Sequence, residues 1–206
     1  MKKRIKERAE LVRKILEETI PDPQIPLLHK DAYTLLIAVL LSAQCTDVRV
    51  NQTTPKLFSL ADTPEKMACL DPKEIETIIR SCGLAPTKSR AIVKLSAKIL
   101  SDYQGKVPDS LEELEKLPGV GHKTASVVIV QAFHKPAFPV DTHIHRCAKR
   151  WGLSKGTTVA QTEKDLKALF PQDCWAKLHL QIVLFARKFC PARGHGAKNC
   201  PICSQM

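Results

Sequence analysis

The sequence of 206 residues contains no hydrophobic run long enough to cross a lipid bilayer. Its strongest apolar run, Leu35 to Leu41, is far shorter than the roughly 20 residues that a membrane-spanning helix needs. The first ten residues are charged and lack the apolar stretch of a signal peptide. We therefore expect a soluble, cytoplasmic protein with no membrane partner.

The sequence also lacks any segment with the sustained alternation of apolar and polar residues that indicates a β-strand. It has no internal repeat and no low-complexity linker. Capped segments with helical apolar spacing alternate instead with short loops, and two helix starts, at Thr63 and Asp71, have proline at the next position. We therefore predict an all-α protein of about ten helices.

The expected helices are spread over the whole chain. Four of them cover residues 4–20, 31–42, 88–101 and 141–151. Five others begin near residues 63, 71, 110, 122 and 158, and the last helix carries residues 178–189.

Negative charge is scarce relative to positive charge, with 21 Asp and Glu against 32 Lys and Arg. The formal net charge is +11 and the isoelectric point about 9.4. Such an excess points to a polyanionic partner, of which nucleic acid is the leading candidate. The basic residues are spread along the chain, which favours a charged face on a folded protein over a basic tail.

Two helices joined by a glycine hairpin are predicted around Gly119 and Gly121. The first begins at Ser110, which has Glu113 at the spacing of a capping box. Both glycines permit backbone angles and close approaches that a side chain would forbid, so the hairpin can press its amides against another molecule. The N-terminus of the second helix suits a phosphate, because unpaired amides and the positive dipole end meet there. A tight helix-to-helix turn is the alternative.

Two charged residues lie close to this hairpin in the sequence. Lys123 is in the first turn of the second helix, where the positive dipole end disfavours its charge. If it is also desolvated, Lys123 shifts toward the neutral amine, which is the nucleophilic form. A solvated lysine near a phosphate is the alternative. Asp141 lies 18 residues later and precedes a helical apolar stripe, so it is a helix N-cap, an acid with a chemical role, or both.

The sequence Leu-Pro-Gly-Val-Gly-His-Lys-Thr-Ala at 117–125, followed by Val-Asp-Thr-His at 140–143, resembles the helix-hairpin-helix DNA glycosylases of the endonuclease III family. Residues 35–47 and Gly83-Leu84, with Lys88 after them, extend the resemblance over most of the chain. The resemblance implies a two-lobed helix-hairpin-helix fold with a cleft between the lobes. The first lobe would be 24–133, and the second 1–23 plus 134–206.

This resemblance implies a base excision repair enzyme that removes oxidised pyrimidines from duplex DNA and cleaves the resulting abasic (AP) site by β-elimination. Lys123 would be the Schiff-base nucleophile and Asp141 the catalytic carboxylate, facing each other across the cleft. The expected partner is duplex DNA with a damaged base or an AP site, and the enzyme would act as a monomer at the nucleoid. The alternatives are a monofunctional mismatch or adenine glycosylase, against which Lys123 argues, and a non-catalytic duplex DNA-binding module.

The resemblance also implies DNA contacts outside the catalytic pair. Gln44 would occupy the gap left by a flipped nucleotide, and Leu84 would wedge between bases. Family members often carry an aromatic residue and an asparagine after this leucine, whereas Ala85 and Pro86 stand here, so the base contacts of this loop stay open. The hairpin contacts would come from Gly119, Val120, Gly121, Lys123 and Thr124.

The chain has eight cysteines, which we expect to be reduced inside a cell. Five of them are scattered and are most simply explained as small core or surface residues: Cys45, Cys69, Cys82, Cys147 and Cys174. The other three lie in residues 190–203, a Cys-rich C-terminal loop that resembles the family's iron-sulfur loop, whose usual spacing is C-x6-C-x2-C-x5-C.

This loop departs from the family pattern at two of its four positions. Ala197 stands at the second position and Met206 at the fourth. A 4Fe-4S cluster normally takes four thiolates, so the resemblance implies a variant cluster with an incomplete thiolate set. The ligands would be Cys190, Cys200 and Cys203, with His195 as a candidate fourth. A zinc site made of the same four residues and a metal-free tail are the alternatives.

Overall fold

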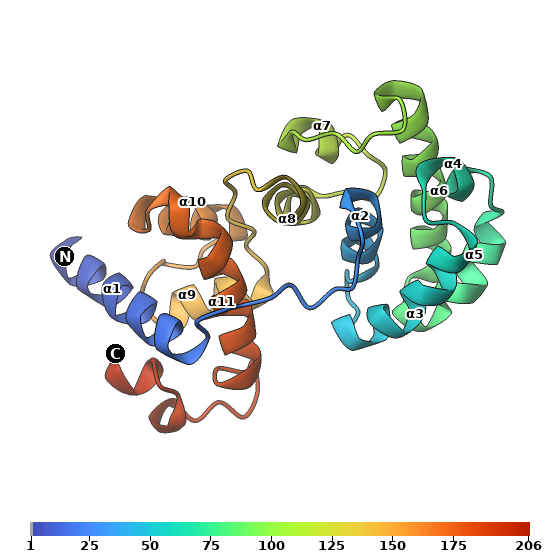
Figure 1. Cartoon of the computed structure of the whole chain (residues 1–206). Coiled ribbons are helices and arrows are strands. Elements are labelled where there is room, and N and C mark those ends of the chain that lie inside the picture. Colours follow the sequence, from blue (N-terminus) through green and yellow to red (C-terminus); the bar gives the residue numbers. More distant parts are fainter. Residues whose placement is uncertain (1) are drawn as a thin grey trace. The chain divides into compact units, whose positions relative to one another are not determined.

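The computed structural model describes residues 2–206, and helix is the only regular secondary structure in that part of the chain (Figure 1). It contains eleven α-helices and four short 3-10 helices, with no strand between residues 2 and 206. The prediction of an all-α fold is therefore confirmed. Within the same range, no helix is both long and apolar enough to cross a membrane.

The chain forms two compact units. We call Ile25–Lys135 the central unit, and Met1–Gln24 together with Pro136–Met206 the terminal unit. The central unit contains α2 (Ala32–Leu41), α3 (Asp47–Leu60), α4 (Pro64–Ala68), α5 (Pro72–Ile79), α6 (Ala85–Tyr103), α7 (Leu111–Glu115) and α8 (His122–Phe133). The terminal unit contains α1 (Lys2–Thr19), α9 (Thr142–Arg150), α10 (Val159–Leu169) and α11 (Trp175–Lys188).

Helix α2 forms the centre of the central unit. Every residue from Tyr33 to Leu41 is buried, as expected of a helix that is apolar on all its faces. The Asp31 side chain starts the helix by accepting a hydrogen bond of 2.8 Å from the Thr34 amide. Helices α3, α6 and α8 pack against α2. The loops that lead out of α2 and into α6 and α8 are thereby fixed to one core.

Helix α3 was not predicted from the sequence, and Pro55 lies inside it. Proline removes one backbone hydrogen bond and crowds the preceding turn, so it argues against a helix interior. Burial of Val50 and Leu57 against the core offsets this penalty. The Thr46 side chain caps the start of the helix by accepting a bond from the Arg49 amide.

Helix α6 begins three residues earlier than the predicted boundary, at Ala85. Pro86 lies in its first turn, where a missing amide hydrogen costs nothing. Leu84 is therefore the residue that caps the helix, and the loop between α5 and α6 is shorter than expected. A 3-10 turn, Arg80–Cys82, extends α5 up to Gly83, which ends it with φ at 68°.

The terminal unit brings the two ends of the chain into one core. Helix α1 packs against α11, and α9 packs against both α10 and α11 (Figure 1). Trp151 is fully buried, and its ring meets that of Phe185 edge to face with centroids 5.7 Å apart. Cys190, Cys200 and Ile202 of the C-terminal loop belong to the same core. The loop is thus a packed part of this unit.

We expect Trp151→Ala to lower the free energy of unfolding by about 3–5 kcal/mol, because it leaves a large cavity in the terminal unit. Denaturant unfolding followed by circular dichroism measures this loss. Val159→Ala, at a residue of the same unit that is 42% exposed, is the control and should change stability by no more than about 0.5 kcal/mol. Equal losses in the two variants would contradict the assigned core.

Candidate functional site

The hairpin between α7 and α8 fits tightly onto α2 and α6 at Gly119. This residue has φ at 80°, a left-handed conformation that residues with a side chain rarely adopt. A Cβ atom there would lie 2.8 Å from Cβ of Ala91 and 3.2 Å from Cδ1 of Leu40. Both the backbone angle and the packing therefore require glycine, as predicted.

Gly121 has a different role. Its φ of −96° is open to any residue, so its backbone angle does not need glycine, and the predicted close approach of another molecule is the reason for glycine that remains. A Cβ at this position would meet no atom within 4 Å. Gly121 is also the N-cap of α8 and makes no side-chain capping bond. Because glycine has no side chain, another molecule can approach this end of α8 closely.

The remaining hairpin residues divide into a buried side chain and exposed ones. Val120 is buried, and its amide donates a hydrogen bond of 3.1 Å to the Leu117 carbonyl. Lys123 is exposed in the first turn of α8, next to the half-buried Thr124. Nδ1 of His122 lies 2.6 Å from Oε1 of Glu115, a contact that joins the start of α8 to the end of α7. The helix start that carries Lys123 is thus tied to the end of α7 by this contact.

The capping box predicted at the start of α7 forms only in part. The Ser110 hydroxyl accepts a hydrogen bond of 3.2 Å from the Glu113 amide, which is the expected cap. The Glu113 carboxylate instead accepts a 2.7 Å bond from the Tyr103 hydroxyl and pairs with Lys116 at 2.5 Å. The hydrogen bond to Glu113 raises the pKa of Tyr103 to about 12. This carboxylate ties α7 to the end of α6.

Lys88 on α6 connects the two other loops that were predicted to contact DNA. Its side chain is buried, and Nζ donates 2.8 Å hydrogen bonds to the carbonyl oxygens of Leu41, Ala43 and Cys82. Burial lowers the pKa of Lys88, while three carbonyl acceptors match the three donors of the charged ammonium. The sequence indicated Lys88 only as part of the resemblance, and its role was missed because the three acceptors are backbone atoms.

Gln44 and Leu84 follow directly on the segments that Lys88 holds. Gln44 is exposed with φ at 54°, and Leu84 is 52% exposed with φ at 52°. Left-handed backbone is uncommon for residues other than glycine and marks positions that their surroundings constrain. The structure thus brings both residues onto the central unit, each at the tip of a short, anchored loop.

Asp141 lies in the terminal unit and caps α9, as the sequence predicted. Its Oδ1 accepts a hydrogen bond of 2.8 Å from the Ile144 amide, and the side chain is half-buried. The cap holds the carboxylate at the start of a helix whose residues Ile144 and Cys147 are fully buried. A capping carboxylate keeps further acceptor positions, so this contact is compatible with a second role.

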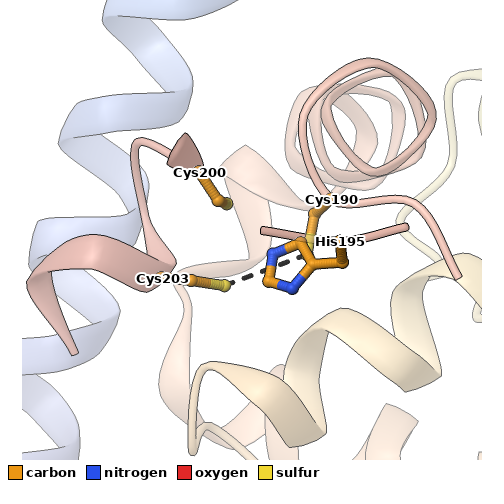
Figure 2. A group of neighbouring side chains, drawn as sticks. All are labelled: Cys190, His195, Cys200 and Cys203. Atoms are coloured by element: carbon orange, nitrogen blue, oxygen red, sulfur yellow. Dashed lines mark hydrogen bonds between the residues drawn. The ribbon is translucent and has the colours of Figure 1, made fainter. Parts of the chain in front are cut away.

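A second group of chemically active side chains gathers in the C-terminal loop (Figure 2). One ligand atom from each of Cys190, His195, Cys200 and Cys203 lies within 4.8 Å of all the others. Cys190 follows the end of α11, whereas Cys200 and Cys203 flank a tight turn. The four predicted ligands therefore come together in a group that could hold a metal.

Arginines of α9 hold the start of this loop. Arg146 donates a hydrogen bond of 3.0 Å to the Cys190 carbonyl, and Arg150 donates 2.7 Å and 3.4 Å bonds to the Pro191 carbonyl and the Cys190 sulfur. Hydrogen bonds from Cys147 and Arg150 lower the pKa of Cys190 to about 5. The loop is thus attached to the same helix that Asp141 caps.

Comparisons with known proteins agree with this geometry. The model of the HhH-GPD superfamily of base excision DNA repair proteins matches residues 37–172. Endonuclease III of Rickettsia prowazekii (strain Madrid E) is 41% identical over 197 residues, which make up 94% of this chain and 93% of that protein.

Two solved structures are similar to nearly the whole chain. A non-covalent endonuclease III-DNA complex has a TM-score of 0.93 at 40% identity and covers 96% of this chain and 92% of its own. A trapped covalent endonuclease III-DNA intermediate has the same TM-score and identity, with 96% and 93% covered.

The helical fold and the helix-hairpin-helix therefore define a base excision DNA repair protein of the HhH-GPD superfamily. Within that superfamily, the chain belongs to the endonuclease III family.

We expect Gly119→Ala to lower the free energy of unfolding by about 2 kcal/mol or more, because it adds both left-handed strain and a clash. Gly121→Ala is the matched change two residues away, and it should alter stability by no more than about 0.5 kcal/mol. Denaturant unfolding of both variants checks the difference. A Gly121→Ala loss as large as that of Gly119→Ala would contradict the distinction between the two glycines.

Lys88→Met should destabilise the protein by about 3 kcal/mol, because two buried carbonyl oxygens and one part-buried carbonyl oxygen lose their donor. It should also weaken binding to duplex DNA with an abasic site, since the loops of Gln44 and Leu84 lose their common anchor. Unfolding curves and fluorescence anisotropy measure the two effects.

Lys94→Met is the control for Lys88→Met, because it removes the same charge from an exposed position of the same helix. Equal effects of the two substitutions would show that net charge, and not the anchor, determines DNA affinity.

Proposed function

We infer that the chain is a base excision repair enzyme that removes a damaged base from duplex DNA and cleaves the strand at the abasic site left behind. The observation that carries this inference is the 40% identity, over 96% of the chain, to an endonuclease III trapped as a covalent intermediate with DNA. The lysine in the first turn of α8 supplies the amine that such an intermediate needs.

Lys123 is the proposed nucleophile. Its neutral amine attacks C1′ of the sugar, the new carbon-nitrogen bond replaces the bond to the base, and the base departs with the bonding electrons. The sugar ring then opens to an iminium, which acidifies the hydrogens on C2′. Loss of one of them as a proton expels the 3′ phosphate and breaks the strand. Water hydrolyses the imine and returns the free lysine.

Asp141 is the proposed catalytic carboxylate. Positive charge develops on the sugar ring as the base leaves, and a nearby carboxylate stabilises that charge and accepts a proton from the attacking amine. The capping bond from the Ile144 amide fixes the Asp141 side chain before the substrate arrives. Such a fixed charge requires little reorganisation during the reaction.

The proposed substrate is duplex DNA in which an oxidised pyrimidine is rotated out of the helix. Gln44 fills the space that the flipped nucleotide leaves, and Leu84 wedges between neighbouring bases. The phosphate backbone contacts the hairpin at Gly119, Gly121, Thr124 and the first amides of α8. The buried Val120 side chain anchors the hairpin to the core of the central unit. The proposed acting form is a monomer at the nucleoid.

Borohydride trapping tests the mechanism, because reduction captures an iminium and nothing earlier. The protein is incubated with duplex DNA that carries either an abasic site or an oxidised thymine, borohydride is added, and covalent adducts are resolved by denaturing electrophoresis. We expect an adduct on both substrates with the unaltered chain and none with Lys123→Ala. Lys116→Ala, at an exposed lysine just before the same hairpin, should keep both adducts.

Asp141→Asn separates the capping role from the catalytic one. Asparagine caps helices as well as aspartate does, so the free energy of unfolding should change by less than about 1 kcal/mol. Base release should nonetheless fall by at least about 100-fold, because the charge is gone. A stable variant with full activity would contradict the catalytic role, and an unaltered chain that releases the base without any adduct would indicate a monofunctional glycosylase.

A further inference from the structure

The donor atoms of the C-terminal loop lie close enough together to surround one metal ion. The Cys190 and Cys203 sulfurs are 3.9 Å apart, and all four donors lie within 4.8 Å of one another. A tetrahedral site with a Zn–S bond of about 2.3 Å has sulfur atoms about 3.8 Å apart. The observed sulfur-sulfur distance therefore matches the edge of a single-ion tetrahedron.

A four-iron cluster makes a different demand on its ligands. Each of its thiolates binds a separate iron at a corner of the cube, so the ligand atoms must enclose an eight-atom cluster. Donors that lie within 4.8 Å of one another suit one ion better than eight atoms. Only three of the donors are thiols, and the family's second and fourth cysteine positions are Ala197 and Met206.

His195 provides an independent observation. Its Nε2 atom is buried and has no hydrogen-bond partner, although the ring lies among the three cysteine side chains (Figure 2). A buried ring nitrogen without a partner is costly, and a metal bond would satisfy it. Gly194, the residue before His195, has a left-handed φ of 68°. An imidazole together with thiolates is a usual donor set for structural zinc.

We propose that this loop binds one zinc ion through Cys190, His195, Cys200 and Cys203, in place of the iron-sulfur cluster that the family resemblance implies. The ion closes the loop onto the terminal unit, whose core already contains Cys190, Cys200 and Ile202. Arg146 and Arg150 hold the loop from α9 and offset the negative charge of three thiolates around a divalent ion. The proposal is independent of the glycosylase activity, because the borohydride assay does not report on the metal.

Metal analysis of the full-length chain tests the proposal. The protein is purified anaerobically, without a metal-binding tag, from cells supplied with both iron and zinc. We expect about one zinc per chain, no iron and no acid-labile sulfide. Replacement of the ion by cobalt(II) should give the intense visible absorption of a tetrahedral thiolate site. Iron with sulfide and the broad visible band of a cluster would overturn the proposal, as would a chain that takes up neither zinc nor cobalt.

Ligand variants test the assignment of each donor. Cys203→Ser and His195→Asn should each weaken zinc binding by more than about 10-fold, since even partners outside the ligand set matter that much. Cys69→Ser and His134→Asn are matched controls at exposed positions and should keep the affinity of the unaltered chain. If a ligand variant does not fold, the cobalt spectrum of the unaltered chain decides alone. Unchanged affinity in folded His195→Asn would contradict the fourth ligand.

Discussion

The burial of α2 is the constraint on which the central unit depends. Its carboxyl end leads into the loop of Gln44, its Leu40 lies where a side chain at residue 119 would clash, and its last carbonyl accepts a bond from Lys88. One apolar helix thereby positions the hairpin and two short loops, whose exposed residues have strained backbone angles. Such preorganised loops lower the entropic cost of binding a rigid duplex, because few side chains and loops have to become ordered in the complex.

In the terminal unit, one helix likewise positions two groups: a carboxylate and the loop with the metal-ligand residues. Helix α9 carries Asp141 as its N-cap, while Arg146 and Arg150 near its other end hold the loop of Cys190. A metal that stabilises the loop would also stabilise this helix, because ligand binding favours the folded state. Helix α9 thus connects the proposed catalytic carboxylate with the proposed metal site through different residues.

The sequence predicted those parts of the protein that depend on local interactions. The caps at Thr63, Asp71 and Asp141 form as their positions indicated. Tertiary contacts account for the misses: core burial overrides Pro55 in α3, and Lys88 binds carbonyl oxygens, which have no sequence signature. The four ligands of the C-terminal loop were predicted, but their spacing in the chain could not fix the distances that separate one ion from a cluster.

The identity of the residue that becomes covalently bound to DNA tests the central claim most directly. The adduct with abasic DNA can be reduced, digested with protease and nuclease, and sequenced by tandem mass spectrometry. The account predicts that the sugar remnant is attached to Lys123, in the peptide that begins the helix after the glycine hairpin. Attachment to another lysine or to the N-terminal amine would contradict it, even if the strand were still cleaved.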